Sequence, residues 1–314
     1  MDKAVSIVAV GANPAWQKVL KFSKFTYDEV NRAYEMWAFA SGKGINFARA
    51  AKVWDKAQVQ VVQFAGGDNG RLLLDDLKRE NLGTYTVETA VPTRCCITCL
   101  SDSDNTMTEL IEPSGVPGQS EQQQALAYIE NAMKNADGMA LCGQLPNGMD
   151  VAFYECCVKI AAAENAKLLI DSWKGIAPVL AACSSGTLKI NKNELSALTG
   201  VEDVYAAAGL LLNSHALEYV AVTAGAGRAH FFARGRAWSY EVPKLPRVVN
   251  PVGSGDTTSA VYLSEITAGE KPEVAFAKAL AAASANCLTM KCGEFDRCKA
   301  EEFFHNINIS ETEF

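Results

Sequence analysis

Histidine is scarce in this sequence, which contains only three among its 314 residues. So few imidazoles leave little material for a metal site or a Ser-His-Asp triad, and no His-Glu-x-x-His pair is present. Two common nucleotide fingerprints, Gly-x-x-x-x-Gly-Lys-Ser/Thr and a Gly-x-Gly-x-x-Gly that follows a strand, are also missing. The sequence therefore disfavours a zinc hydrolase, a triad hydrolase and an ordinary phosphate-loop protein.

An excess of positive charge and long apolar runs are absent as well. The formal net charge of −7 disfavours nucleic acid as a partner but permits a small anion in a locally basic pocket. The most apolar window, residues 275–290, carries Lys278 and is too short to span a bilayer. The apolar run near the N-terminus follows Asp2 and ends at Asn13-Pro14, so we expect a buried first strand rather than a signal peptide.

The ten cysteines do not form a paired Cys-x-x-Cys pattern. Three of them, Cys95, Cys96 and Cys99, lie in the run TRCCITCL, which is typical of a strand. Cys96 and Cys99 would then face opposite ways, while Cys95 and Cys99 would lie roughly 13 Å apart on one face. Neither pair suits a single metal ion, so we expect reduced thiols in a cytoplasmic protein.

Strand-like and helix-like segments alternate from about residue 58 onward. The expected strands are the apolar runs VQVVQFAGG, GMALCG, KLLID, TLKI and EYVAVTAGAG. Fully apolar strands separated by amphipathic helices are typical of a parallel sheet covered on both faces. The predicted fold is therefore α/β, with a Rossmann-like core of three layers around a mostly parallel sheet.

Two segments, residues 11–40 and 90–112, interrupt this alternation and have no helix of their own. The second resembles a hairpin that turns at SDSDN. We expect the two segments to form a small β-sheet lid over the carboxyl ends of the core strands, where open α/β folds bind ligands. The core would then comprise residues 1–10, 41–89 and 113–314.

Five clusters of glycine and polar or charged residues follow predicted strands. They contain Gly42, Lys43 and Asn46; Gly143; Lys189, Asn191 and Glu194; Thr223, Gly225 and Gly227; and Gly253, Ser254, Gly255 and Asp256. A single glycine after a strand is usually only a turn, but five such clusters at one predicted sheet edge indicate a ligand site. Glycines let the backbone approach a phosphate, and a lysine supplies the opposite charge.

The last cluster, NPVGSGD, admits two interpretations. Asp256 is either the N-cap of the helix that follows or a base beside an anion held by the backbone N–H groups of the glycine turn. The residues alone leave both open.

Two segments, ASGKGINFARAAK and NPVGSGDTTSA, resemble the paired signatures of the ribokinase-like, or phosphofructokinase-B type, sugar kinases. The resemblance covers nearly the whole chain in order, through NPA, DEVNR, PTR, TELIE, CGQLPNG, KINKNEL, VTAGAG and SANCLT. Within the family it is closest to the ketohexose-phosphate branch of tagatose-6-phosphate kinases and 1-phosphofructokinases. NPVGSGD and TELIE favour the tagatose side.

The resemblance implies a kinase that transfers the γ-phosphoryl group of ATP to a hydroxyl of a ketohexose phosphate. Asp256 would be the catalytic base, and the backbone N–H groups around Gly253, Ser254 and Gly255 would hold the transferring phosphoryl group. Lys43 would hold the phosphate already on the sugar.

The remaining site residues are assigned by the same resemblance. Arg94 would share the sugar phosphate with Lys43, and Glu194 would order Mg²⁺ through water. The sugar would also contact Asn13, Gln17, Gly42, Asn46 and Gly143. ATP would lie along Lys189, Asn191, Thr223, Gly225, Gly227, Gly253, Gly255 and Asn286.

The chain departs from the family pattern at Gln17, where related kinases carry an acid that accepts hydrogen bonds from sugar hydroxyls. Trp16 beside it either stacks on the sugar or packs inside the lid. Two rival functions follow: a kinase of an unphosphorylated sugar or nucleoside, and a sugar-phosphate-binding protein that has lost catalysis. Lids of related kinases pair between copies, so a homodimer through the lid is also expected.

Overall fold

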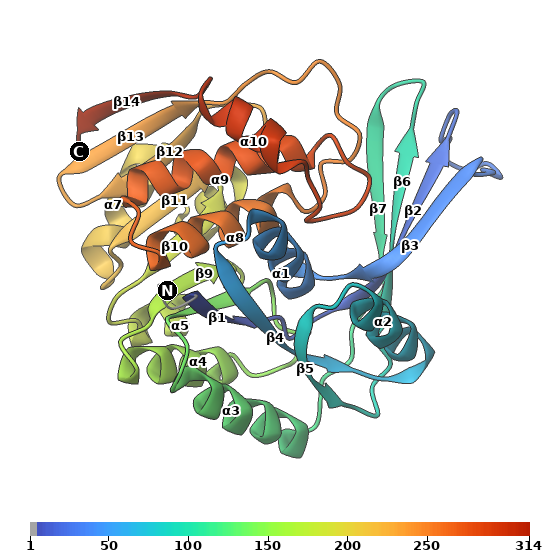
Figure 1. Ribbon diagram of the computed structural model, residues 1–314, viewed down its shortest axis with the longest axis horizontal. Helices are drawn as coiled ribbons and strands as arrows, with labels where there is room; N and C mark the ends of the chain where they lie inside the picture. Colours follow the sequence, from blue (N-terminus) through green and yellow to red (C-terminus); the bar gives the residue numbers. More distant parts are fainter. Residues whose placement is uncertain (1–4) are drawn as a thin grey trace.

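The computed structural model describes residues 5–314, and a ten-stranded sheet forms the centre of the larger domain (Figure 1). From one edge to the other, the strands are β14 (Asn308–Glu313), β13 (Arg236–Glu241), β12 (Ala229–Ala233), β11 (Tyr219–Thr223), β10 (Thr187–Asn191), β9 (Lys167–Asp171), β8 (Gly138–Cys142), β1 (Val5–Val10), β4 (Ala57–Ala65) and β5 (Gly83–Glu88). All neighbours from β11 to β5 run parallel. The predicted first strand is β1, whereas Asp2 and the rest of residues 1–4 lie outside the described part.

Helices cover both faces of this sheet. One face packs on α3 (Gln119–Met133), α4 (Ala152–Ala163), α5 (Ala177–Ala182), α6 (Lys192–Thr199) and α7 (Val204–Ser214). The other packs on α1 (Lys43–Trp54), α8 (Ser254–Thr267), α9 (Pro272–Asn286) and α10 (Arg297–Phe304). Alternate strand residues supply the two cores, as Val8 and Val10 face one side and Ile7 and Ala9 the other. The predicted three-layer core is confirmed.

The small sheet projects from the core beside the start of α1 (Figure 1). Its strands, in order, are β3 (Glu35–Ser41), β2 (Ala15–Phe22), β6 (Arg94–Ser101) and β7 (Thr106–Ile111). The hairpin between β6 and β7 turns at residues 102–105, within the predicted SDSDN turn. Helix α2 (Gly67–Arg79) supports the sheet, and Trp16 packs with Leu73 and Leu77 rather than in the cleft.

The antiparallel extension of the large sheet, β12 to β14, was not predicted from the sequence. Strand β14 has the sequence NISETE and is exposed along its whole length. Because no buried face marks it, its position depends on pairing with β13 rather than on a hydrophobic pattern. In residues 5–314 no single helix is long and apolar enough to cross a membrane, although α6 and α7, bent by 57°, reach that composition when taken together.

Candidate active site

A cleft of about 860 Å³ lies between the small sheet and the core. It is lined by the carboxyl ends of β10 and β11, the first turns of α1 and α8, and residues of β2, β6 and β7. The predicted site residues that line it are Gln17, Gly42, Lys43, Asn46, Arg94, Lys189, Asn191, Glu194, Thr223, Gly225, Gly253, Ser254, Gly255 and Asp256. The volume lies in the range of small-molecule sites.

Asp256 lies in the first turn of α8 with its carboxyl at the cleft. It is not the N-cap, which is Gly253. Oδ2 of Asp256 accepts a hydrogen bond of 2.8 Å from Nδ2 of Asn46 in α1. Burial raises the pKa of the Asp256 carboxyl above its ordinary value, against the opposing attraction of the Lys43 ammonium. A buried carboxylate with a raised pKa is suited to accept a proton.

The turn before α8 borders the same space, because Gly253, Ser254 and Gly255 all line the cleft. Gly253 has φ of 87°, a left-handed conformation that favours glycine. It is the N-cap of α8, which has 14 residues. The first turn of a helix leaves N–H groups without intrahelical partners and carries the positive end of the helix dipole. A Cβ at Gly255 would lie 2.8 Å from the Nζ atom of Lys189, so this cation lies directly against the turn.

A second carboxylate, Asp171, ends β9 and is buried below the cleft. Its Oδ1 lies 2.7 Å from Nζ of Lys43, and its Oδ2 lies 3.3 Å from Nζ of Lys189. Ser259 in α8 donates to Oδ2 at 2.8 Å. Burial favours a raised pKa for Asp171, but the two ammonium groups outweigh it and lower the pKa to about 2. Asp171 is therefore ionised and holds both lysines in place.

Asp171 was not among the site residues predicted from the sequence, although a signal was present. It is the last residue of the apolar run KLLID, at the carboxyl end of a parallel strand, where polar residues point to a site. Glu109 of β7 was missed too, because no sequence pattern shows which side chains of a lid face the core. It lines the cleft, and burial raises its pKa, with a further contribution from Asp256.

The lid side of the cleft contains Gln17 and Arg94. Gln17 is buried and its Nε2 donates to Oγ1 of Thr98 at 2.9 Å. Arg94 donates from Nη2 to the backbone oxygen of Asn13 at 3.2 Å, and its buried Nε has no protein partner among residues 5–314. Asn13 itself lines a smaller cavity beside the cleft.

Gly143, Gly227 and Asn286 do not line the cleft. Gly143 lies under the aliphatic chain of Lys43, and Gly227 closes a turn by donating to the oxygen of Ala224. The amide of Asn286 is buried and donates to the oxygen of Glu294 at 2.9 Å. It therefore braces the turn after α9. The α9 side of the cleft is lined instead by Leu280, Ala283, Ser284 and Cys287.

Asn191 and Glu194 form the N-terminal cap of α6. The side chain of Asn191 accepts from the N–H of Glu194, and the Glu194 carboxylate accepts from the N–H of Asn191, each at 2.9 Å. In residues 5–314 no group of three or more His, Cys, Asp or Glu side chains forms a metal site. Glu194 lines the cleft. A single carboxylate beside substrate phosphates fits Mg²⁺, which keeps several waters and binds few carboxylates.

Nearly the whole chain matches one family of known proteins. The family model described as pfkB family carbohydrate kinase matches residues 5–297. A tagatose-6-phosphate kinase of Staphylococcus epidermidis is 25% identical over 313 residues, covering 97% of this chain and 99% of that protein.

Solved structures give the same fold. Phosphofructokinase-2 from Escherichia coli in complex with substrates and products has a TM-score of 0.87 at 22% identity, with 96% of this chain and 99% of that one covered. A carbohydrate kinase from Agrobacterium tumefaciens has a TM-score of 0.75 at 17% identity, with 98% and 100% covered. The match of the family model over nearly the whole chain shows that this protein belongs to the pfkB family of carbohydrate kinases, phosphotransferases that act on a sugar hydroxyl.

Proposed function

We propose that this kinase uses ATP to phosphorylate a hydroxyl of a ketohexose phosphate, of the tagatose 6-phosphate or fructose 1-phosphate type. The observation that carries the proposal is the buried Asp256 carboxylate, which lies in the first turn of α8 beside the cations of the cleft. A base, a set of backbone donors and cations around one cleft are the requirements of phosphoryl transfer.

In the proposed reaction, Asp256 accepts the proton of the sugar hydroxyl as its oxygen bonds to the γ-phosphorus. The bond between that phosphorus and the β,γ-bridging oxygen breaks, and ADP leaves. The N–H groups of Gly253, Ser254 and Gly255 stabilise the charge on the transferring group, assisted by Lys189 against the turn. Mg²⁺, when bound, neutralises the nucleotide phosphates, and Glu194 would hold its waters.

Arg94 is the better placed of the two proposed ligands for the sugar phosphate. Its Nε has no protein partner among residues 5–314, and a guanidinium suits bidentate contact with phosphate. Lys43 is already paired with Asp171, and its charge also acts on Asp256. Gln17 and Glu109 both line the cleft, so Glu109 can supply the carboxylate that Gln17 lacks.

The nucleotide would lie on the opposite side of the cleft. Thr223 ends β11 and Gly225 follows it, and the apolar surface of α9 offers a wall for the adenine. We propose that Asn286 and Gly227 act on the nucleotide only through the turns that they brace, because neither lines the cleft.

The test is ADP release with ATP and a panel of tagatose 6-phosphate, fructose 1-phosphate, fructose 6-phosphate and the free sugars. We expect turnover on a phosphorylated ketohexose and little on its free sugar, since Arg94 would lose its partner. Higher kcat/KM on a free sugar or nucleoside would support the first rival function. Binding of sugar phosphates without ADP release would support the second.

Asp256→Asn tests the proposed base. We expect kcat to fall by about a thousandfold, within the range of general-base catalysis, while ATP still binds. The wild-type kcat should fall on the acid side with an apparent pKa above that of an ordinary aspartate, because the carboxylate must be ionised and burial raises its pKa. Near-normal turnover in the variant would remove Asp256 as the base.

A further inference from the structure

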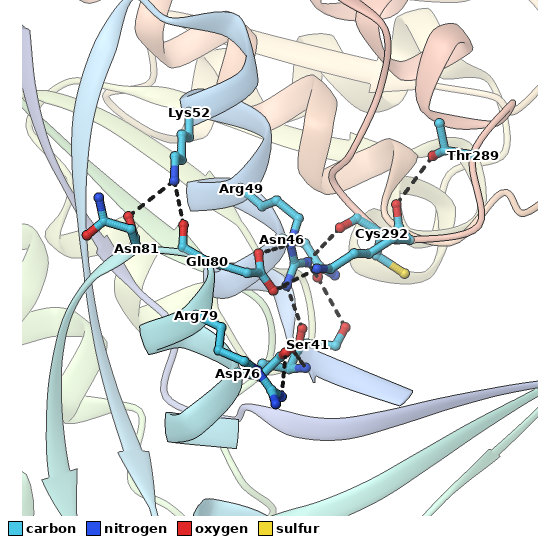
Figure 2. A network of polar contacts seen from close by, with 12 residues as sticks. Ser41, Asn46, Arg49, Lys52, Asp76, Arg79, Glu80, Asn81, Thr289 and Cys292 are labelled. Carbon is cyan, nitrogen blue, oxygen red and sulfur yellow. Dashed lines mark hydrogen bonds and ion pairs between the residues drawn. The ribbon is translucent and has the colours of Figure 1, made fainter. Parts of the chain in front are cut away.

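Arg49, one turn after Asn46 in α1, has a buried guanidinium that lies outside the cleft lining. Its Nε and Nη2 donate to the two carboxylate oxygens of Glu80 at 2.7 and 2.9 Å. Nη2 also donates to the backbone oxygen of Ala40 at 2.7 Å, and Nη1 to that of Cys292 at 2.7 Å. Figure 2 shows this network, in which one side chain joins α1 to the end of β3, the end of α2 and the loop after α9.

The same guanidinium fixes the amide of Asn46. Oδ1 of Asn46 accepts from Nη1 of Arg49 at 3.2 Å and from Oγ of Ser41 at 3.1 Å (Figure 2). A side-chain amide has one accepting and one donating end. With both donors on its oxygen, Asn46 must direct its nitrogen toward the carboxylate of Asp256.

The contact with Cys292 supports the anion-binding turn as well. A Cβ at Gly253 would lie 2.8 Å from Cβ of Cys292, so the loop around Cys292 packs directly against this turn. Gly293 lies against the backbone of Asn46, where a side chain would overlap the carbonyl oxygen. The loop is thus enclosed between α1 and the start of α8, and Arg49 holds it there.

The charge of Arg49 is balanced within the network. Burial favours a raised pKa for Glu80, but Arg49 and Lys291 outweigh it, so the pKa of this carboxyl is lowered and it stays ionised. Lys291 reaches Oε1 of Glu80 at 2.9 Å from the same loop as Cys292. Because Glu80 balances its charge, Arg49 affects Asn46 through the direction of its hydrogen bond rather than through net charge.

We propose that Arg49 is a positioning residue for phosphoryl transfer: it orients the Asn46 amide toward Asp256 and holds the Cys292 loop against the Gly253 turn. The proposal rests on the proposed function, in which Asp256 is the base. Arg49 itself would touch neither substrate.

The test is the pH dependence of kcat at saturating substrates for Arg49→Lys and Ser41→Ala. Lysine keeps the charge, but one ammonium group cannot satisfy Glu80, Ala40, Asn46 and Cys292 together. Without oriented donors on its oxygen, the Asn46 amide can turn, and Asp256 loses a hydrogen bond to its charged form. We expect the acid limb of the kcat–pH profile, where kcat falls as the pH is lowered, to shift to higher pH by about one unit in Arg49→Lys and by less in Ser41→Ala.

Lys52→Met is the matched control, because Lys52 also joins α1 to the end of α2, through the backbone oxygen of Glu80, without contacting Asn46. Its acid limb should match that of the wild type. In an Asn46→Ala background, Arg49→Lys should no longer move the limb, since the amide that it orients is gone.

An unmoved acid limb in folded Arg49→Lys protein, or an equal shift in Lys52→Met, would overturn the proposal. If Arg49→Lys does not fold, Ser41→Ala decides, because it removes only a single neutral donor. The parallel Asp256→Asn assay tests the catalytic base separately from the positioning role of Arg49. An active Asp256→Asn enzyme contradicts the base, whereas an inactive one with an unchanged Arg49→Lys profile contradicts only the positioning role.

Discussion

Two buried carboxylates, Asp256 at the cleft and Asp171 below it, have pKa shifts of opposite direction. Burial dominates at Asp256 and raises its pKa, whereas two lysines lower the pKa of Asp171 to about 2. The first is therefore suited to gain a proton and the second to stay charged. Two aspartates therefore differ in pKa because burial dominates at one and neighbouring ammonium groups dominate at the other.

Asp171→Asn should destabilise the protein by roughly 3 kcal/mol or more, because it leaves the buried Lys189 without its counter-charge. Urea denaturation at neutral pH measures the loss. The double variant Asp171→Asn/Lys189→Met should lose less, because the buried Lys189 ammonium is removed together with its counter-charge. Lys43 also loses Asp171, but its side chain is 38% exposed and stays in contact with water. A double variant as unstable as the sum of its parts would contradict the pairing.

At the scale of elements, the start of α6 combines a structural and a ligand-binding feature. The Asn191 and Glu194 side chains cap the helix reciprocally, and both also line the cleft. Glutamine at the third position preserves such a cap, whereas alanine at the first position removes it. Substitution therefore separates the cap from the proposed Mg²⁺ role.

Asn191→Ala should lower the free energy of unfolding by about 1 kcal/mol, the usual cost of losing a cap. Glu194→Gln should leave stability nearly unchanged but raise the Mg²⁺ concentration needed for half-maximal activity. Thermal unfolding and a Mg²⁺ titration of kcat measure the two effects. An unchanged Mg²⁺ requirement in Glu194→Gln would remove Glu194 from the metal site.

In the molecule as a whole, the small sheet, which is the predicted lid, exposes apolar side chains on its edge strands β3 and β7 and on the loop between β2 and β3. Met36 on β3 is 62% exposed, Leu110 on β7 is 51% exposed, and Tyr27 in the loop is 94% exposed. Unpaired edge strands with apolar residues invite pairing with another sheet. We propose that a second copy of this chain covers them in a homodimer.

Sedimentation velocity at micromolar concentration should then show a dimer for the wild type and a monomer for Leu110→Glu. The matched control is Leu210→Glu, since Leu210 is 47% exposed on α7, far from the lid in the fold. A monomeric wild type, or a Leu110→Glu variant that stays dimeric, would contradict assembly through the lid.

Local patterns in the sequence predicted the parallel core, the small sheet and the polar clusters of the cleft, but not the β12–β14 extension. Apolar runs such as KLLID and TLKI are long enough to mark buried parallel strands, and the polar residues that end or follow them mark the carboxyl edge. Lys43, Asn46 and Asp256 lie in the first turns of helices that follow glycines, and the family resemblance assigned them to one site. Asn286 was assigned to the ATP site but does not line the cleft, whereas its neighbours Ala283, Ser284 and Cys287 do.

The α/β alternation, the small sheet and the polar clusters at strand ends depend on neighbours along the chain, so they could be predicted without the structure. The folded structure was needed to show that Asn46 donates to Asp256, that Asp171 pairs with two lysines, and that Arg49 donates to the amide oxygen of Asn46. These pairs join residues on separate elements, and their energies depend on distance and burial in space. No periodicity along the chain encodes either quantity.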